Sequence, residues 1–305
     1  MRLDEKYPIL ISILFNIVAI MVKAAIFSNT LSRAVYSEIF HSIGDTSNSL
    51  TLYIGTRASR AKPSPRYPFG VGKALYLSSL FSSIILGGSI FYMIIAENLR
   101  IYSSAEIHVI ASGGHLYWLY MLALSLFDTA TLILSVKMMR AREGRSIVLA
   151  PLVLEDLMGI SGNIMASASL ILSNTIADLV FSSVIAFITL AGSIHIGYRS
   201  IEALLGHSAP KEVIARIVKI SLSIPGVVDV NDVKTMLIDP DRYLAIVQTE
   251  VKEDMTIKEV EEIKEEIVDS IKKNLPEIQY LILDIVKPKE PAKSYVSLLR
   301  EIKEI

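Results

Sequence analysis

Six long apolar stretches restrict what this chain can fold into more than any other feature of its sequence. A transmembrane helix needs about 20 predominantly apolar residues, and hydrogen-bond satisfaction inside lipid makes spanning segments of this kind helical. The composition agrees, since 52% of the 305 residues are hydrophobic and the mean hydropathy is +0.49. We therefore expect six transmembrane helices, at residues 8–28, 31–56, 74–98, 116–138, 149–173 and 175–199.

The basic residues of the connections predict the orientation of these helices. Lys and Arg gather in the connections 57–73 and 138–148, whereas the connection 99–115 holds only Arg100. Cytoplasmic loops carry the excess of Lys and Arg, so these two connections are expected in the cytoplasm. With six spans, the N- and C-termini are then both cytoplasmic, and the chain is a multi-pass protein of the cell membrane.

The C-terminal third has a different character. The first 207 residues hold 15 Lys and Arg with 12 Asp and Glu, and the remaining 98 residues hold 15 and 19. We expect a transmembrane domain over 1–206, a cytoplasmic domain over 207–288 and a C-terminal tail over 289–305. The cytoplasmic domain is predicted to be an α+β, ferredoxin-like unit of order αββαβ.

Its five elements follow from the pattern of the residues. Helical spacing and the first-turn Pro210 predict a helix over 210–224. Alternating segments around a Pro-Gly turn and an Asp-Pro-Asp turn predict two strands, and a third follows the second helix. That helix has Thr256 as its N-cap and an apolar stripe made of Ile257, Val260, Ile263, Ile267 and Ile271.

Ionisable residues interrupt the second apolar segment. His41 and Asp45 are four residues apart and share one helix face, Glu38 lies close to the same stripe, and Asn48 extends the face by a turn. A neutral imidazole with a carboxylate is a suitable donor pair for a divalent cation, and ionisable residues inside a membrane mark functional sites by default. The alternative is a His–Asp hydrogen bond that only holds helices together.

The fifth segment carries two adjacent acids, Glu155 and Asp156, which point about 100° apart on a helix. Only one of them can face a site shared with the second segment. Gly159 and Gly162 form a small-residue face that lets helix backbones approach closely, and such an approach brings Asp156 within reach of the second segment. The alternative is that both acids cap a helix that starts after Pro151.

Three further charged residues lie in the apolar segments. Lys23 and Asp128 can pair with each other or line a pathway, and Asp178 is expected to be an acid of a helix-cap region.

The chain resembles the cation diffusion facilitator family over residues 8–288. The resemblance is carried by "HSIGDTSNSLTLYIGTRASRAKPSPRYPFGVGKALY", with its His-x-x-x-Asp followed by a basic loop and a Pro-Phe-Gly-x-Gly-Lys run, and by "GVVDVNDVKTMLIDPDRYLAIVQTEV". The family consists of six-helix divalent-metal exporters with a cytoplasmic αββαβ domain.

The resemblance implies a set of metal ligands. His41 and Asp45 match the ligands of the second helix, and Asp156 matches the acid of the fifth helix. The family places a His or Asp four residues before that acid, where this chain has Leu152. The chain resembles the branch that has a Glu-Asp pair, so Glu155 is a candidate replacement, with Asn48 or water as other options.

The implied function is export of a divalent cation from the cytoplasm by proton antiport with alternating access, as a homodimer. Zinc comes first on family grounds, and the acid-rich donor set also suits Mn²⁺ or Fe²⁺. Thiolate ligands are excluded because the chain has no cysteine, and the net charge of −1 argues against nucleic acid as a partner. The alternative function is a membrane metal sensor or scaffold that does not transport; we do not expect an enzyme.

Overall fold

The computed structural model describes residues 3–58, 63–104, 116–141, 149–240 and 242–288. Its chain divides into two compact units, Met1–Leu204 and Leu205–Ile305. The C-terminal tail 289–305 and parts of the two basic connections, residues 59–62 with Arg60 and residues 142–148 with Arg142, lie outside the described residues.

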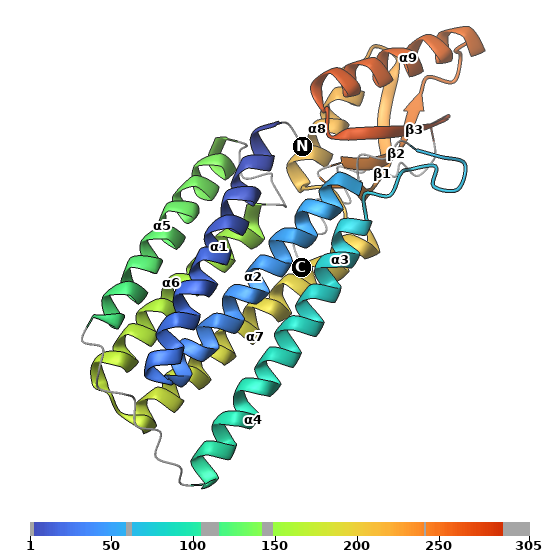
Figure 1. Cartoon of the computed structure of the whole chain (residues 1–305). Coiled ribbons are helices and arrows are strands. Elements are labelled where there is room, and N and C mark those ends of the chain that lie inside the picture. The colour runs from blue at the N-terminus through green and yellow to red at the C-terminus, as the bar shows by residue number, and fades with distance from the viewer. Residues whose placement is uncertain (1–2, 59–62, 105–115, 142–148, 241, 289–305) are drawn as a thin grey trace. The chain divides into compact units, whose positions relative to one another are not determined.

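The first unit is a bundle of long helices (Figure 1). Every apolar segment of the sequence is helical, as predicted. The third is continuous but built of three pieces, because a π-helical stretch interrupts it. In chain order the elements are α1 (Leu3–Thr30), α2 (Arg33–Ala58), α3 (Ala74–Ser82), the π-helical η1 (Ser83–Gly88), α4 (Ser89–Ser104), α5 (Tyr117–Ala141), α6 (Leu149–Leu172) and α7 (Thr175–Leu205).

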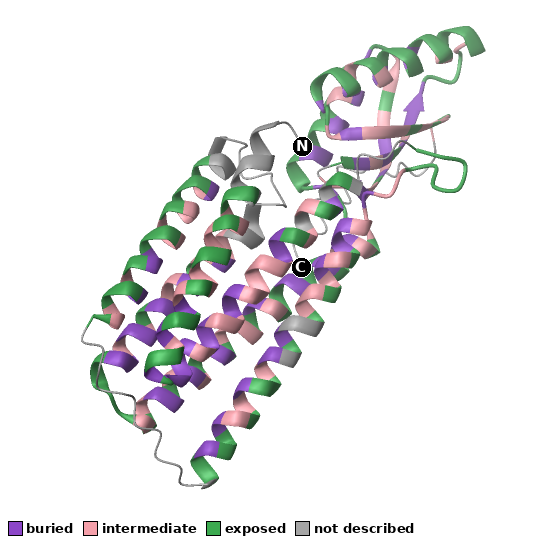
Figure 2. Ribbon diagram, in the orientation of Figure 1, coloured by how far each residue is buried: buried purple, intermediate pink, exposed green. Residues whose placement is uncertain are grey.

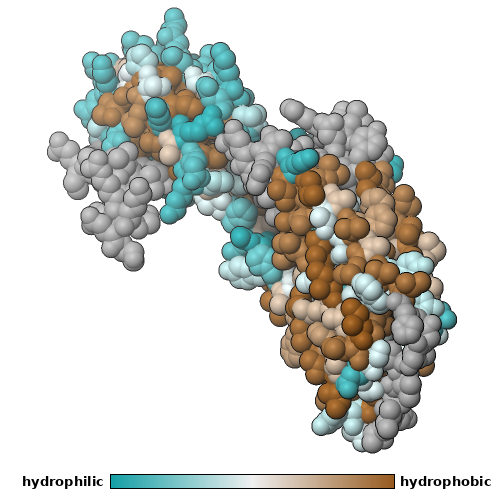
Figure 3. Space-filling view, turned by 90° about the vertical axis from the view of Figure 1, so that its left-hand side faces the viewer, coloured by the Kyte–Doolittle hydropathy of each residue, from teal (hydrophilic) through white to brown (hydrophobic). Residues whose placement is uncertain are grey.

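The outer surface of this bundle is apolar. Figure 2 shows exposed residues along the outside of the helices, and Figure 3 shows that hydrophobic residues cover most of the visible face. Large side chains such as Leu126, Tyr92 and Phe187 are exposed there, as in a protein surrounded by lipid. Among the described residues, three segments are long and apolar enough to cross a membrane by length and composition: Leu10–Thr30, Tyr117–Lys137 and Thr175–Leu205.

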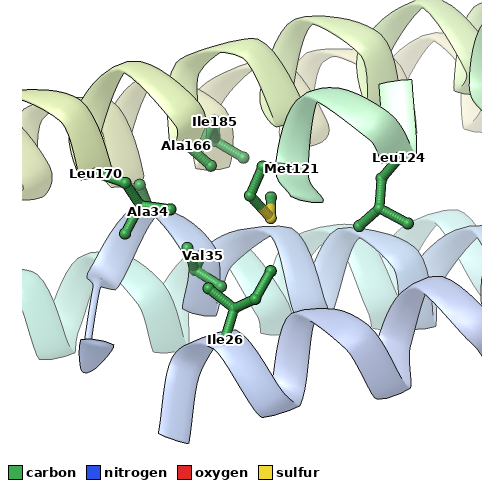
Figure 4. Packing of buried hydrophobic residues seen from close by; sticks show 8 residues of the cluster. All are labelled: Ile26, Ala34, Val35, Met121, Leu124, Ala166, Leu170 and Ile185. Carbon is green, nitrogen blue, oxygen red and sulfur yellow. The ribbon is translucent and has the colours of Figure 1, made fainter. Parts of the chain in front are cut away.

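Helix α2 is the centre of the bundle, because it packs against α1, α3, α4 and α6. Near its N-terminal end the side chains of five helices form an apolar cluster (Figure 4). This cluster fixes α2 against α1, α5, α6 and α7. Its buried members are Ile26, Ala34, Val35, Met121, Leu124, Ala166, Leu170 and Ile185.

Asp178 of α7 anchors the start of α2. Its carboxylate accepts hydrogen bonds from the backbone N–H groups of Arg33 (2.5 Å) and Ala34 (3.1 Å) and from the hydroxyl of Ser32 (2.7 Å). These N–H groups have no partner within the helix, and a negative charge is favourable at a helix N-terminus. The prediction of a capping acid is therefore confirmed, although Asp178 caps α2 rather than its own helix.

The second unit has the predicted αββαβ order. It comprises α8 (Lys211–Leu222), β1 (Val227–Asp239), β2 (Arg242–Val251), α9 (Ile257–Asn274) and β3 (Ile278–Val286). The sheet has the order β1-β2-β3, with β1 antiparallel and β3 parallel to β2. The turn before β1 depends on Gly226, whose φ of +98° favours glycine.

Helix α9 begins with a capping box. Thr256 Oγ1 accepts from the N–H of Glu259, and the Glu259 carboxylate accepts from the N–H of Thr256 at 2.7 Å. The N-cap prediction is confirmed. The predicted apolar stripe is wrong at its first member, since Ile263, Ile267 and Ile271 are buried but Ile257 is 82% exposed.

Candidate metal centre

One face of α2 lines a pocket inside the helical bundle. His41, Asp45 and Asn48 occupy that face at intervals of four and three residues, so they stack along one side of the helix. Side chains of α6 and α7 and residues of the α3–η1–α4 segment close the pocket from other sides. These are Ser82, Ser83, Gly87, Ile90, Glu155, Met158, Thr189, Ser193 and Ile196.

The imidazole of His41 is oriented by Thr189 of α7. Thr189 Oγ1 lies 3.3 Å from His41 Nδ1 and 3.0 Å from the carbonyl oxygen of Ile185. A hydroxyl has one proton to donate, and the shorter bond to the Ile185 carbonyl takes it. The Thr189 oxygen then accepts from Nδ1–H, which places the lone pair of the neutral ring on Nε2.

Nε2 of His41 faces a second acceptor. It lies 3.3 Å from Asp45 Oδ2, and among the described residues it has no hydrogen-bond donor to satisfy it. Two acceptors at this distance in a buried site repel each other unless a cation or a proton lies between them. The pair is thus suited to bind a cation, or to hold a proton when the cation is absent.

Glu155 of α6 brings a second carboxylate to this pocket. Its Oε1 accepts a hydrogen bond from Asn48 Nδ2, and the side chain is buried. Helix α6 begins at Leu149, so Glu155 and Asp156 lie beyond its first turn and do not cap it. The alternative interpretation of these two acids as helix caps is therefore wrong.

Asp156 points to a different neighbour. Its Oδ1 accepts a hydrogen bond of 2.7 Å from Thr131 on α5, and Asp156 is not among the residues that line the pocket. Adjacent helical residues diverge by about 100°, so only one of the two acids can face α2. The expectation that Asp156 meets His41 and Asp45 is not met in this conformation, because Asp156 turns to α5 and Glu155 is the acid of this pair that lines the pocket.

The pocket is looser than a formed metal centre. Within the described residues, no three His, Asp or Glu side chains converge closely enough to hold a metal ion as they stand. His41, Asp45 and Glu155 line one pocket, but Glu155 is engaged with the Asn48 amide rather than with the other two. For His41, Asp45 and Glu155 to bind one ion, the hydrogen bond between Asn48 and Glu155 must break. Alternatively, the side-chain carbonyl oxygen of Asn48 joins the ligands.

Sequence reasoning missed two parts of this pocket. Thr189 lies in an apolar segment without any motif, so only its contact with His41 reveals it. The π-helical stretch that contributes Ser83 and Gly87 is also unexpected, although a Gly-Gly pair inside an apolar span was a signal. π-helical turns are frequent at functional sites.

The remaining intramembrane charges form separate contacts. Lys23 of α1 pairs with Glu38 of α2 at 2.7 Å, whereas Asp128 of α5 accepts from Asn163 Nδ2 at 2.8 Å. Lys23 therefore pairs with Glu38 and not with Asp128. Glu38 faces α1 and lies apart from the pocket of His41.

The fold and the pocket define a helical membrane protein in which an imidazole and two acids line a pocket between the helices, followed by a small α+β domain. Two family models match this chain: "Cation efflux transmembrane domain" at residues 9–205 and "Cation efflux protein, cytoplasmic domain" at residues 209–285. The chain belongs to the cation efflux family, the cation diffusion facilitators. Membership of this family implies a cation transporter rather than an enzyme.

Individual relatives agree with this assignment. The chain is 30% identical over 230 residues to the proton-coupled zinc antiporter SLC30A9, mitochondrial, of Mus musculus, a match that covers 67% of this chain and 39% of the relative. It is 22% identical to the cation-efflux pump FieF of Escherichia coli O1:K1 / APEC, with 88% and 89% of the two chains covered. The chain thus spans about two fifths of the mouse relative and most of the bacterial one.

A solved structure that matches the C-terminal unit is the cadmium form of a MamM C-terminal domain variant. Its sequence identity is 20%, with 26% of this chain and 98% of that chain covered, and the TM-score is 0.25.

Proposed function

We propose that this protein exports a divalent metal cation from the cytoplasm in exchange for protons. The observation that carries the proposal is the pocket that His41 and Asp45 of α2 line together with Glu155 of α6. Buried ionisable side chains on two helices, aimed into one pocket, are the arrangement expected of a substrate site in a membrane transporter.

Proton exchange follows from the chemistry of the donors. A neutral imidazole nitrogen and ionised carboxylates bind a metal, so each of these groups must be free of its proton when the metal arrives. Protons that bind from the opposite side then displace the metal. The His41–Asp45 pair supports this view, because its two acceptors accommodate either a proton or a cation between them.

Alternating access requires the pocket to change its shape. Its walls come from α2, α6, α7 and the π-helical interruption between α3 and α4, so a small shift of one helix against another alters the ligand distances. We propose that metal binding draws Glu155 away from Asn48 toward His41 and Asp45, and that rocking of the helices opens the loaded site to one side at a time.

Glu155 replaces the metal ligand that the family has at the position of Leu152. In this proposal Glu155 is the acid that the fifth span contributes, Asn48 supplies a further oxygen, and Asp156 supports α6 through α5 or replaces Glu155 in another conformation. The chain is then a member of the branch with a Glu-Asp pair on the fifth span.

Zinc is the first candidate for the substrate. The mouse relative is named a zinc antiporter, and one imidazole with carboxylates accepts Zn²⁺. The same donor set has more oxygen than nitrogen, which also suits Mn²⁺ or Fe²⁺.

We further propose that the transporter is a homodimer of the cell membrane with both termini in the cytoplasm. The basic connections support the orientation. The match of residues 209–285 to the family's cytoplasmic domain supports both the location of the C-terminal unit and its pairing.

The proposal is tested with the purified full-length chain in liposomes. Uptake of Zn²⁺, Mn²⁺ and Fe²⁺ is followed with a metal-sensitive dye while a second dye reports the internal pH. We expect metal uptake coupled to an opposite movement of protons, stopped by collapse of the pH gradient. Metal binding without flux contradicts export and favours a sensor or scaffold instead.

A further inference from the structure

A buried ion pair joins α1 to α2 away from the metal pocket. Lys23 Nζ lies 2.7 Å from Glu38 Oε2, and the two side chains are 2% and 0% exposed. The ammonium also donates to Ser42 Oγ at 2.8 Å. Neither member of the pair lines the pocket. Burying two charges costs free energy, and the proposed metal site does not explain why this pair is present.

One oxygen of the Glu38 carboxylate is left without a donor. Oε1 accepts no hydrogen bond from any described residue. It lies against α6 at Gly162, where a Cβ atom would occupy the place of this oxygen. A buried acceptor without a hydrogen-bond donor is costly, and a proton on Oε1 removes this unpaired acceptor.

The charged groups around Glu38 come from two helices. Lys23 approaches from α1, and Asp128 of α5 is close enough to interact electrostatically with both Lys23 and Glu38. From α6 the backbone at Gly162 packs on the carboxylate, and Asn163 donates to Asp128. His41, one turn further along α2, is the nearest titratable group of the pocket in sequence.

Protonation of Glu38 changes the charge next to the pocket. As an ion pair, Lys23 and Glu38 together are neutral. A proton on Glu38 leaves the ammonium of Lys23 unpaired beside Ser42, the residue that directly follows His41. Lys23 interacts electrostatically with His41 and Asp45, and an unpaired positive charge there disfavours a divalent cation in the pocket.

We propose that the Lys23–Glu38 pair is a second proton-binding site of this transporter, separate from the metal ligands, where a proton on Glu38 is released when the metal binds. Coupling between two sites is reciprocal, so a metal that is repelled by protonated Glu38 must itself expel that proton. This inference rests on the proposed exchange of metal for protons. The alternative is that the pair has a purely structural role and only holds α1 against α2.

The number of protons released per metal distinguishes the two roles. Zn²⁺ binding to the full-length protein in detergent is measured from pH 6 to 8, in steps, as wild type and as the neutral double variant Lys23→Met/Glu38→Gln. Each proton released makes the affinity change by about tenfold per pH unit. We expect the slope of log Kd against pH to be shallower in the double variant by about 0.5 to 1.

Two further variants complete the test. Glu38→Gln alone removes the same titrating group without removing the cation, so it should lower the slope in the same way and also weaken Zn²⁺ binding. Arg199→Gln/Glu202→Gln removes an exposed ion pair of α7 and should keep the wild-type slope.

The outcomes separate this inference from the proposed function. An unchanged slope of log Kd against pH in folded Lys23→Met/Glu38→Gln or Glu38→Gln protein overturns the second proton site and shows that the pair is purely structural. A wild-type slope of zero contradicts proton exchange itself, whatever the variants show.

Discussion

The hydroxyl of Thr189 on α7 lies 3.3 Å from Nδ1 of His41 on α2, and its own proton is directed to the carbonyl of Ile185. This contact fixes which nitrogen of the imidazole faces Asp45. A residue without any sequence motif therefore orients the central donor of the pocket.

Replacing this hydroxyl tests its role. Thr189→Val keeps the shape of the side chain but removes the acceptor for Nδ1–H, so we expect metal affinity to fall by about 10-fold to 100-fold, the usual effect of losing an outer hydrogen bond to a ligand. Thr189→Ser keeps the hydroxyl and should bind nearly as the wild type does. Isothermal titration with Zn²⁺ measures both, and equal affinities of Thr189→Val and wild type would refute the assignment.

The adjacent acids of α6 should have unequal roles. Glu155 lines the pocket, whereas Asp156 accepts from Thr131. We expect Glu155→Gln to abolish metal flux in liposomes and Asp156→Asn to lower it by a smaller factor. The two substitutions each remove one charge from neighbouring positions, so each is the control for the other. The reverse order of effects would assign the ligand to Asp156, as the family pattern alone implies.

The anchor of α2 should be important for stability. Asp178 accepts hydrogen bonds from two backbone N–H groups, and Ser169 Oγ also donates to it at 2.5 Å. Hydrogen bonds to a charged group each contribute about 1.5–3 kcal/mol, so Asp178→Ala should lower the free energy of unfolding by more than about 3 kcal/mol.

A matched control exists at the start of α7. Asn174 Oδ1 accepts from the N–H of Ala177 at an exposed helix end, where Asn174→Ala should cost only about 1 kcal/mol. Thermal unfolding in detergent compares the two variants. Similar losses would show that Asp178 acts as an ordinary cap.

The capping box of α9 gives a pH dependence. Hydrogen bonds from the N–H and the hydroxyl of Thr256 lower the pKa of the exposed Glu259 carboxyl below its ordinary value. The ionised form therefore stabilises the folded helix end fully above the ordinary pKa of Glu, and this contribution is lost as the pH falls through the lowered pKa. Hydrogen exchange at the first turn of α9, corrected for intrinsic rates, should show constant protection near neutral pH and a loss in acid.

Thr256→Ala is the variant for this test. It removes the hydroxyl donor to the Glu259 carboxylate but keeps the backbone N–H donor of residue 256, so the acid-dependent loss of protection should become smaller and the protection at neutral pH should fall. An acid transition of undiminished size in Thr256→Ala would have another origin.

Much of the fold could be predicted because it follows from local patterns. Six apolar stretches predict helices by length alone, and the turn residues between 225 and 242 predict a hairpin. Ile257 marks the limit of such reasoning. It continues the apolar spacing of Ile263 and Ile267, but its side chain is 82% exposed at an open pocket that it lines with Leu283 and Ile285 of β3.

The pocket could be predicted only in part. The spacing of His41 and Asp45 fixes their common face on any helix, so that part required no tertiary information. Which of Glu155 and Asp156 turns toward α2 depends on the rotation of α6, which the packing of Gly162 on Glu38 helps to set. Likewise, the sequence suggested Asp128 as the partner of Lys23, and only the packing of α1 on α2 shows that the partner is Glu38.

The most direct test of the central claim is Zn²⁺ flux through liposomes containing Asp45→Ala or His41→Ala protein that remains folded, with wild-type protein at the same density beside it. The account predicts that neither variant moves zinc faster than liposomes without protein. Flux at the wild-type rate in folded Asp45→Ala protein would contradict it.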